Sequence, residues 1–230
     1  MILSLVVAAN LVMPTATVCV GALAPQTPAA AGPRVSAPQQ ADTVADSTLV
    51  ALYASGTDFA TFLAAAEARK AAWQKNWTEG RVPEDAVAVA QSLPGKWRLL
   101  VVAVDGCSDS VNTIPYIARL VARVPSLEMR IVLPEPGRPV MEAHRTPDGR
   151  PATPTVVLLD EAGRNVGCWI ERPAELQRQA VAAREAGTLD AFQRGKQAWY
   201  DADAGASTVR EVGVMLEAAA AGSPRCDAKR

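Results

Sequence analysis

The stretch WRLLVVAVDGCSDS, residues 97–110, decides the fold. Residues 97–104 form a short run of apolar and β-branched side chains, which is typical of a strand buried on both faces. Asp105 and Gly106 give a turn signal after this run, and Cys107 follows them directly. Behind the cysteine, apolar residues recur at helical spacing at Val111, Ile114, Ile117 and Leu120, with Pro115 inside the predicted helix. The stretch therefore predicts a strand that leads into a helix, with a cysteine at the junction.

The segments downstream complete a sheet. Further strands are predicted over residues 127–133, 155–159 and 165–170, and the turn at residues 161–163 joins the last two. A short helix around residues 140–144, a helix that begins at Pro173 and a long Ala-rich helical region over residues 188–222 accompany them. Parallel strands need crossover helices and antiparallel strands need only a turn, so the order predicts an α/β fold: a thioredoxin-like mixed four-stranded sheet with flanking helices.

Helices are also predicted upstream of the first strand. The first covers residues 46–54 and the second runs from a cap at Thr57 or Asp58 to about residue 77. A third begins at Pro83, where Glu84 and Asp85 suit a first helical turn. We therefore expect an N-terminal helical extension over residues 44–93, a main domain over residues 94–187, and a C-terminal helix and tail over residues 188–230.

Composition excludes several classes of function. The 230 residues suit one domain with additions, and the 23 basic and 24 acidic residues nearly cancel. Because no basic stripe with interleaved aromatic residues is present, we expect no nucleic-acid partner. The only histidine is His144, which is expected to be solvated at the end of a short helix. The four cysteines show no paired spacing. We therefore expect no metal centre and no cofactor.

The N-terminus indicates export. Residues 1–24 carry no charged side chain and contain an apolar run of signal-peptide length, although an uncleaved membrane anchor is the alternative. Cys19 as a lipid acceptor is less favoured, because Val18 stands where a small residue is needed. Residues 25–43, rich in Pro and Ala, are expected to be a disordered linker. The expected location is periplasmic or envelope-anchored.

Cys107 is the candidate reactive group. Free backbone N–H groups and the dipole at a helix N-terminus favour an anion, and therefore a thiolate, at this position. The hydroxyls of Ser108 and Ser110 can donate to the sulfur. The carboxylate of Asp109 would raise the pKa of the Cys107 thiol if it lies close to the sulfur. Alternatively, Asp109 caps the helix and points away from the sulfur.

Four features together resemble the thioredoxin-like superfamily. The motif Cys107-Ser108-Asp109-Ser110 occupies the strand-to-helix position where thioredoxins have CxxC, and Pro115 follows eight residues later. Thr153-Pro154 opens the third strand, as the cis-proline loop does, and a hairpin closes the sheet. Residues 105–117 and 151–173 are similar to a bacterial subgroup with Cys-Gly-Asp and Trp-x-x-Arg-Pro motifs. The second motif reads here Trp169-Ile170-Glu171-Arg172-Pro173. The resemblance covers roughly residues 90–185.

The resemblance implies roles for individual residues. Cys107 would attack a substrate disulfide, Pro154 in cis would hold the loop that faces the thiol, and the backbone of Thr153 would pair with the substrate chain. Ser110 stands in place of the resolving cysteine, and Gly106 replaces a tryptophan that often shields the site. Many thioredoxins bury a carboxylate six residues before the reactive cysteine, and Val101 stands at that position here.

These departures restrict the expected activity. A lone thiol can form a mixed disulfide and then needs an external thiol reductant, so monothiol oxidoreductase or isomerase activity on protein or small-thiol disulfides is implied. The alternative is a non-catalytic interaction module at the cell envelope. Cys168 is expected to pack within its strand, with pairing to Cys226 or resolution of Cys107 as alternatives.

Overall fold

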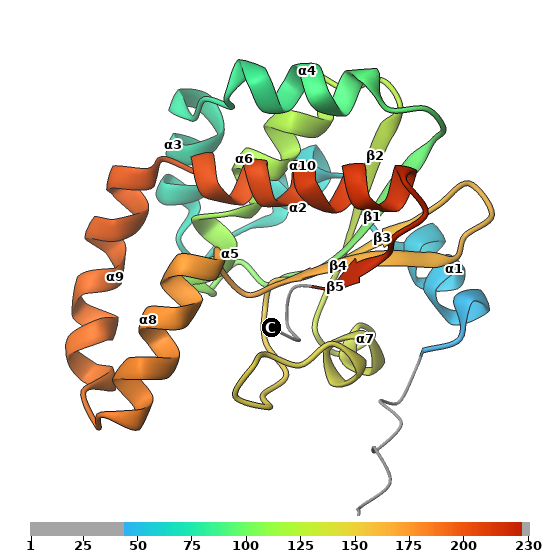
Figure 1. Cartoon of the computed structure of the whole chain (residues 1–230). Helices are drawn as coiled ribbons and strands as arrows, with labels where there is room; N and C mark the ends of the chain where they lie inside the picture. Colours follow the sequence, from blue (N-terminus) through green and yellow to red (C-terminus); the bar gives the residue numbers. More distant parts are fainter. Residues whose placement is uncertain (1–43, 227–230) are drawn as a thin grey trace, which may run out of the picture. The chain divides into compact units, whose positions relative to one another are not determined.

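The computed structural model describes residues 44–226, and its centre is a mixed sheet with strand order β2-β1-β3-β4-β5 (Figure 1). The strands are β1 (Trp97–Val102), β2 (Leu127–Val132), β3 (Thr155–Leu159), β4 (Asn165–Ile170) and the two-residue β5 (Arg225–Cys226). β1 and β2 are parallel, whereas β3 is antiparallel to both β1 and β4. The predicted α/β fold with its mixed four-stranded sheet is confirmed, and β5 adds a short parallel strand beside β4. The predictions for residues 1–43 lie outside the described residues.

Helices cover both faces of the sheet, because successive strand residues point to opposite sides. On one face, α1 (Asp46–Ser55) and α7 (Arg138–Ala143) bury Leu49, Val140 and Met141 against β1 and β3. The other face carries the larger core. It is built from α2 (Phe59–Ala65), α3 (Lys70–Glu79), α4 (Glu84–Ser92), α6 (Ile114–Val121) and α10 (Ala206–Ala220). Helices α8 (Ala174–Glu185) and α9 (Leu189–Asp203) lie side by side (Figure 1).

Two predicted long helices are each divided in two. The helix expected to run to about residue 77 breaks after α2, and Arg69 with a φ of 54° precedes α3. The Ala-rich region breaks at Ala204 and Gly205, which have φ values of 48° and 80°. A Cβ at Gly205 would collide with the ring of Tyr116, so a close approach to α6 requires glycine at this break.

The helix after Cys107 is also divided. The four-residue α5 (Ser108–Val111) is followed by α6, and Pro115 lies in the first turn of α6 rather than inside a helix. Proline suits this position because the N–H that it lacks has no partner within the first turn of a helix.

Both edges of the four-stranded sheet formed by β1 to β4 have a further backbone partner. At the β2 edge, Thr57 exchanges two hydrogen bonds with Ile131, with N···O distances of 2.9 and 2.7 Å. At the other edge, β5 pairs with β4. Within residues 44–226, no helix combines the length and the apolar character that a bilayer span requires.

Candidate active site

Cys107 lies at the N-cap of α5, after the turn of residues 103–106 that follows β1. Its thiol is free and partly exposed, and it is the only unpaired cysteine among the described residues. The thiol lies 3.2 Å from the carbonyl oxygen of Thr153, to which it can donate, and the backbone N–H of Ser110 donates to the sulfur over 3.4 Å. The sequence-predicted residues Cys107, Ser110 and Thr153 therefore do meet at one site.

Ser110 contributes differently from what the sequence predicts. Its side chain is fully buried, and its hydroxyl oxygen has no hydrogen-bond partner within the described structure. The hydroxyl faces the interior, so the contact with the sulfur comes from the backbone. Because α5 is a single turn, it also aligns fewer peptide dipoles than the longer predicted helix would.

The loop that faces the thiol is fixed by the sheet. The Thr153–Pro154 peptide bond is cis, Thr153 is half-buried and Pro154 is buried. The carbonyl oxygen of Pro154 accepts a hydrogen bond from the backbone of Glu171 at 2.7 Å, and the hydroxyl of Thr155 donates to the carbonyl oxygen of Ala152 at the same distance. These bonds hold the loop at the end of β3, opposite Cys107.

Asp109 turns into the protein and joins a buried charge cluster, which we call the Asp109 cluster. Its carboxylate accepts hydrogen bonds from Tyr200 at 2.7 Å, Lys196 at 2.9 Å and Arg172 at 3.3 Å. Each of these residues is less than a tenth exposed. Asp109 therefore does not cap the helix, because three donors from distant segments bind it. Burial raises the pKa of Tyr200 well above 10, and the charge of Asp109 and its hydrogen bond act in the same direction.

Arg172 links the Asp109 cluster to two further side chains, Glu171 and Phe192. The guanidinium group of Arg172 also pairs with Glu171 at 2.5 Å and lies 5.5 Å from the ring centre of Phe192 in α9. Sequence reasoning named Asp109 and Arg172 but not Lys196 or Tyr200. The only sequence signal for these two was a Lys and a Tyr four residues apart on a predicted helix, which gives no indication of a distant partner.

The N-terminal extension also contributes to the site. The carboxylate of Asp105 accepts hydrogen bonds at 2.8 Å from the backbone of Glu67 and of Ala68, and these bonds lower its pKa. The indole of Trp73 donates to the carbonyl oxygen of Asp105 at 2.9 Å. Arg69 donates to the carbonyl oxygen of Gly106 over the same distance. The break between α2 and α3, together with Trp73 of α3, therefore supplies the groups that hold the turn before Cys107.

Gly106 leaves the site open on the outside. It is exposed, and a Cβ at this position would lie 3.8 Å from the Cβ of Ala68, which is an ordinary contact. Val101, in contrast, is fully buried in the larger core, so the interior behind the cysteine is apolar at that position.

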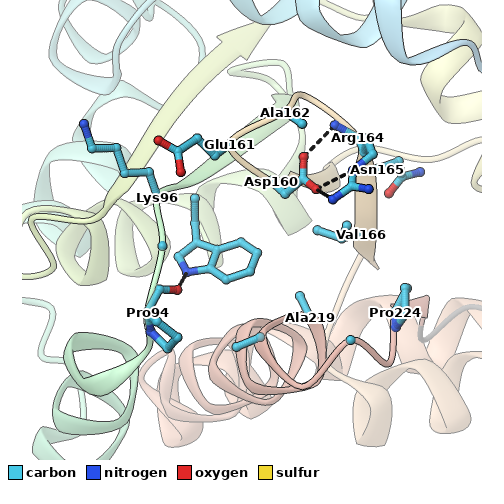
Figure 2. Close-up of a pocket in the computed structure, with 14 residues that line it drawn as sticks. Pro94, Lys96, Asp160, Glu161, Ala162, Arg164, Asn165, Val166, Ala219 and Pro224 are labelled. Atoms are coloured by element: carbon cyan, nitrogen blue, oxygen red, sulfur yellow. Dashed lines mark hydrogen bonds and ion pairs between the residues drawn. The ribbon is translucent and has the colours of Figure 1, made fainter.

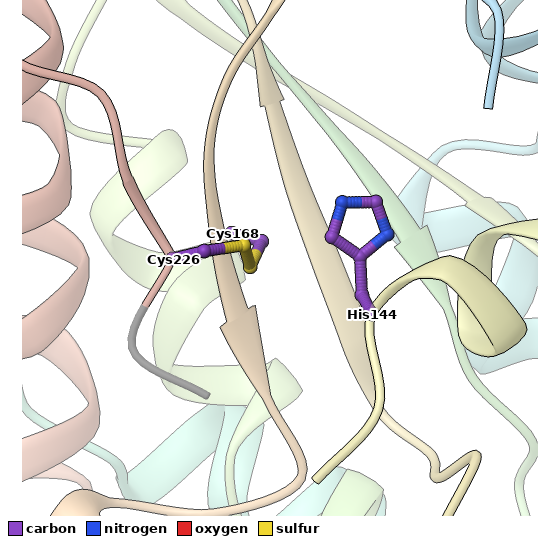
Figure 3. Close-up of side chains that lie close together, drawn as sticks. All are labelled: His144, Cys168 and Cys226. Atoms are coloured by element: carbon purple, nitrogen blue, oxygen red, sulfur yellow. A yellow bond between two sulfur atoms is a disulfide. The ribbon is translucent and has the colours of Figure 1, made fainter. Parts of the chain in front are cut away.

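Cys168 and Cys226 form a disulfide between β4 and β5, with a Cα–Cα distance of 4.5 Å. Cys168 is fully buried, and this bond leaves it unable to resolve a mixed disulfide on Cys107. His144 lies beside the disulfide (Figure 3). The predicted solvated position of His144 is wrong, since only 8% of the residue is exposed and both ring nitrogens make hydrogen bonds.

A separate concave surface lies at the opposite end of β1. This cavity of about 950 Å³ is bounded by residues 94–97, the β3–β4 turn and the end of α10 (Figure 2). Inside it, Arg164 pairs with Asp160 at 2.7 Å. None of the sequence-predicted site residues lines this cavity.

The comparisons with known proteins agree on the fold. A family model described as thioredoxin matches residues 56–186. A Pseudomonas aeruginosa protein of unknown function has a similar structure, with a TM-score of 0.56, 22% identity, and coverage of 73% of this chain and 96% of that one. An HIV epitope scaffold gives a TM-score of 0.54, 20% identity and the same coverage of 73% and 96%. At such identities the likeness extends to the fold alone. No curated protein matches the chain.

Proposed function

Because this chain belongs to the thioredoxin family, we propose that it is a monothiol thiol-disulfide oxidoreductase or isomerase with Cys107 as the nucleophile. Its centre would be a CxxS variant of the Cys-x-Asp type, formed by residues 107–110. The observation that carries the proposal is the free, partly exposed Cys107 thiol at 3.2 Å from the carbonyl oxygen of Thr153.

The proposed reaction is thiol–disulfide exchange. The Cys107 thiolate attacks one sulfur of a substrate disulfide, the substrate S–S bond breaks, and the second substrate sulfur leaves as a thiolate. Ser110 has no sulfur, and Cys168 is already bonded to Cys226. An external thiolate must therefore attack the mixed disulfide, which returns Cys107 as a thiolate and releases the substrate joined to that thiol. The exchange moves disulfides between partners without net oxidation of the protein.

The surroundings of Cys107 favour a polypeptide or small-thiol disulfide as substrate. Gly106 is exposed beside the thiol, so a disulfide can reach it from solvent. The Thr153 backbone, half-buried and next to the sulfur, can pair with an extended substrate chain. The Asp109 cluster and the bonds to Asp105 would hold the cysteine turn in place during the exchange.

The test uses the full chain with Cys19→Ser, so that Cys107 is the only free thiol. Oxidised glutathione is added, and the intact mass is followed before and after addition of reduced glutathione. We expect one glutathione adduct, mapped to Cys107, that reduced glutathione removes, and repeated turnover of a glutathionylated peptide. A Cys107→Ser variant should form no adduct. Failure to form the adduct, or an adduct that thiols do not remove, would instead favour the non-catalytic interaction module.

Export is part of the proposal. It rests on the uncharged, apolar residues 1–24, and the Cys168–Cys226 disulfide supports an oxidising compartment. Thiol trapping with a maleimide in intact and lysed cells tests it. An exported chain keeps this disulfide in cells and fractionates with the envelope or periplasm. In a cytosolic chain, Cys168 and Cys226 are reduced and the maleimide modifies both of them.

A further inference from the structure

Three groups that bind soft metal ions meet on the α7 face of the sheet. The ligand atoms of His144, Cys168 and Cys226 all lie within 4.8 Å of one another (Figure 3). They come from the end of α7, from β4 and from β5. His144 and Cys168 are buried, whereas Cys226 is partly exposed. The cluster is therefore buried at His144 and Cys168 and accessible to solvent at Cys226.

The hydrogen bond at Nδ1 orients the His144 ring as in metal-binding histidines. Nδ1 lies 2.9 Å from the carbonyl oxygen of Val140, and a carbonyl can only accept, so Nδ1 carries the proton. Nε2 is then the acceptor, and it receives the side-chain amide of Asn165 at 3.1 Å. In metal-binding histidines, a backbone carbonyl commonly accepts a hydrogen bond from one ring N–H, and the other ring nitrogen coordinates the metal.

From this arrangement we propose that His144, Cys168 and Cys226 form a redox-gated zinc site, which is closed in the disulfide form and opened by reduction. A dithiol reductant supplies two electrons and two protons, so the Cys168–Cys226 bond breaks into two thiols and the reductant becomes a disulfide. Zn²⁺ then displaces both thiol protons and takes the two thiolates, with Nε2 replacing its bond to Asn165 by a bond to the metal.

The ligand set and its surroundings favour zinc. In a tetrahedral site with Zn–S of about 2.3 Å and Zn–N of about 2.0 Å, neighbouring ligand atoms are roughly 3.5–3.8 Å apart, which the observed spacing allows. Cys168 lies opposite Val157, which belongs to the apolar cluster with Val140 and Met141. Zn²⁺ with two thiolates and a neutral imidazole has no net charge, so burial beside this cluster carries a small desolvation cost. Water can fill the fourth position from the side of Cys226.

The test follows the only imidazole of the chain. The full chain with Cys19→Ser and Cys107→Ser, prepared without a histidine tag, is reduced with dithiothreitol. The reductant is removed under anaerobic conditions, and Zn²⁺ is titrated against a chromophoric chelator. We expect one Zn²⁺ per reduced chain, none at the same concentrations in the oxidised chain, and a shift of the His144 ring resonances in long-range ¹H–¹⁵N spectra.

Two variants separate the proposed site from surface binding. His144→Asn should weaken zinc binding by more than about 10-fold, since loss of even a supporting group costs that much. Asn165→Ala, which removes the amide that competes for Nε2, should bind zinc at least as tightly as the parent. If the reduced chain stays folded by circular dichroism but binds no zinc, or binds it without movement of the imidazole resonances, the proposal is wrong. The spectra of the parent chain decide this even if His144→Asn does not fold.

Discussion

The Asp109 carboxylate lies 3.3 Å from the guanidinium group of Arg172, and this ion pair joins the cysteine turn to the segment that follows β4. Both groups are buried, and Lys196 and Tyr200 complete the contacts of the carboxylate. A buried charge is tolerated only when its partners are in place. The position of the turn before and after Cys107 therefore depends on side chains far along the chain.

Asp109→Asn is expected to destabilise the fold strongly. It leaves Lys196 and Arg172 buried with one less negative partner, which typically costs about 3–5 kcal/mol of unfolding free energy. Urea unfolding of both proteins measures it. Asp85→Asn is the control, because Asp85 forms an exposed pair with Arg210 at 3.7 Å and should change stability by at most about 1 kcal/mol. Equal effects of the two substitutions would contradict a supporting role for the Asp109 cluster.

Tyr200→Phe tests the same cluster through alkaline pH. Loss of the hydrogen bond to Asp109 should cost about 1.5–3 kcal/mol at neutral pH, because the acceptor is charged. The raised pKa of Tyr200 means that its stabilising contribution is complete below the unfolded pKa of about 10 and declines as pH rises above it. The wild type should therefore lose more stability than Tyr200→Phe between about pH 9 and about pH 11. Parallel pH profiles for the two proteins would argue against this pKa shift.

Asp148 is expected to contribute strongly to the loss of folding stability at acidic pH. Burial would raise its pKa, but hydrogen bonds from Arg150 and Thr146 and the charges of Arg150 and Arg184 outweigh burial and lower the pKa to about 2. A lowered pKa means that the contribution is complete above the unfolded value of about 3.9 and is lost as pH falls toward about 2. Asp148→Asn should flatten the stability profile in this window by about 2 kcal/mol. Thermal unfolding at several pH values measures the difference, and an unchanged slope would refute it.

The Cys168–Cys226 disulfide is expected to stabilise the fold from the C-terminal side. It links residues 58 positions apart, and closure of such a loop corresponds to about 4 kcal/mol in the chain-entropy model, with about 2–4 kcal/mol typical in practice. Cys226→Ala should lose this amount in urea unfolding, and the reduced wild type should lose a similar amount. A reduced wild type that is as stable as the oxidised protein would contradict the prediction.

The sequence predicts the sheet well because its signals are local. The strands over residues 155–159 and 165–170 have the predicted bounds, since an apolar β-branched run and a turn signal lie next to each other. The helix breaks were missed because Arg69 and Ala204 adopt a left-handed conformation that their residue types do not signal. A Gly follows Ala204, but the ring of Tyr116 that makes it necessary comes from another helix.

The parts of the site that were missed depend on distant partners. Lys196 meets Asp109 across 87 residues, and Asp105 meets the backbone of Ala68 across 37. Cys168 and Cys226 meet because β5 adds to the sheet edge, a strand too short to give a periodic pattern. The sequence offers the pairing of Cys168 with Cys226 only as an alternative, and it gives no signal that a buried His144 lies beside these two sulfurs.

The backbone hydrogen bonds at the two edges of the sheet have a consequence for aggregation. An unpaired outer strand is a template on which a second molecule can add, and this is a common first step toward fibrils. Here the Thr57 bridge protects one edge and β5 protects the other. The Cys168–Cys226 bond adds a covalent link to the backbone pairing of β5 with β4, so we expect the bond that holds the tail also to help keep separate copies of the chain from adding to this edge.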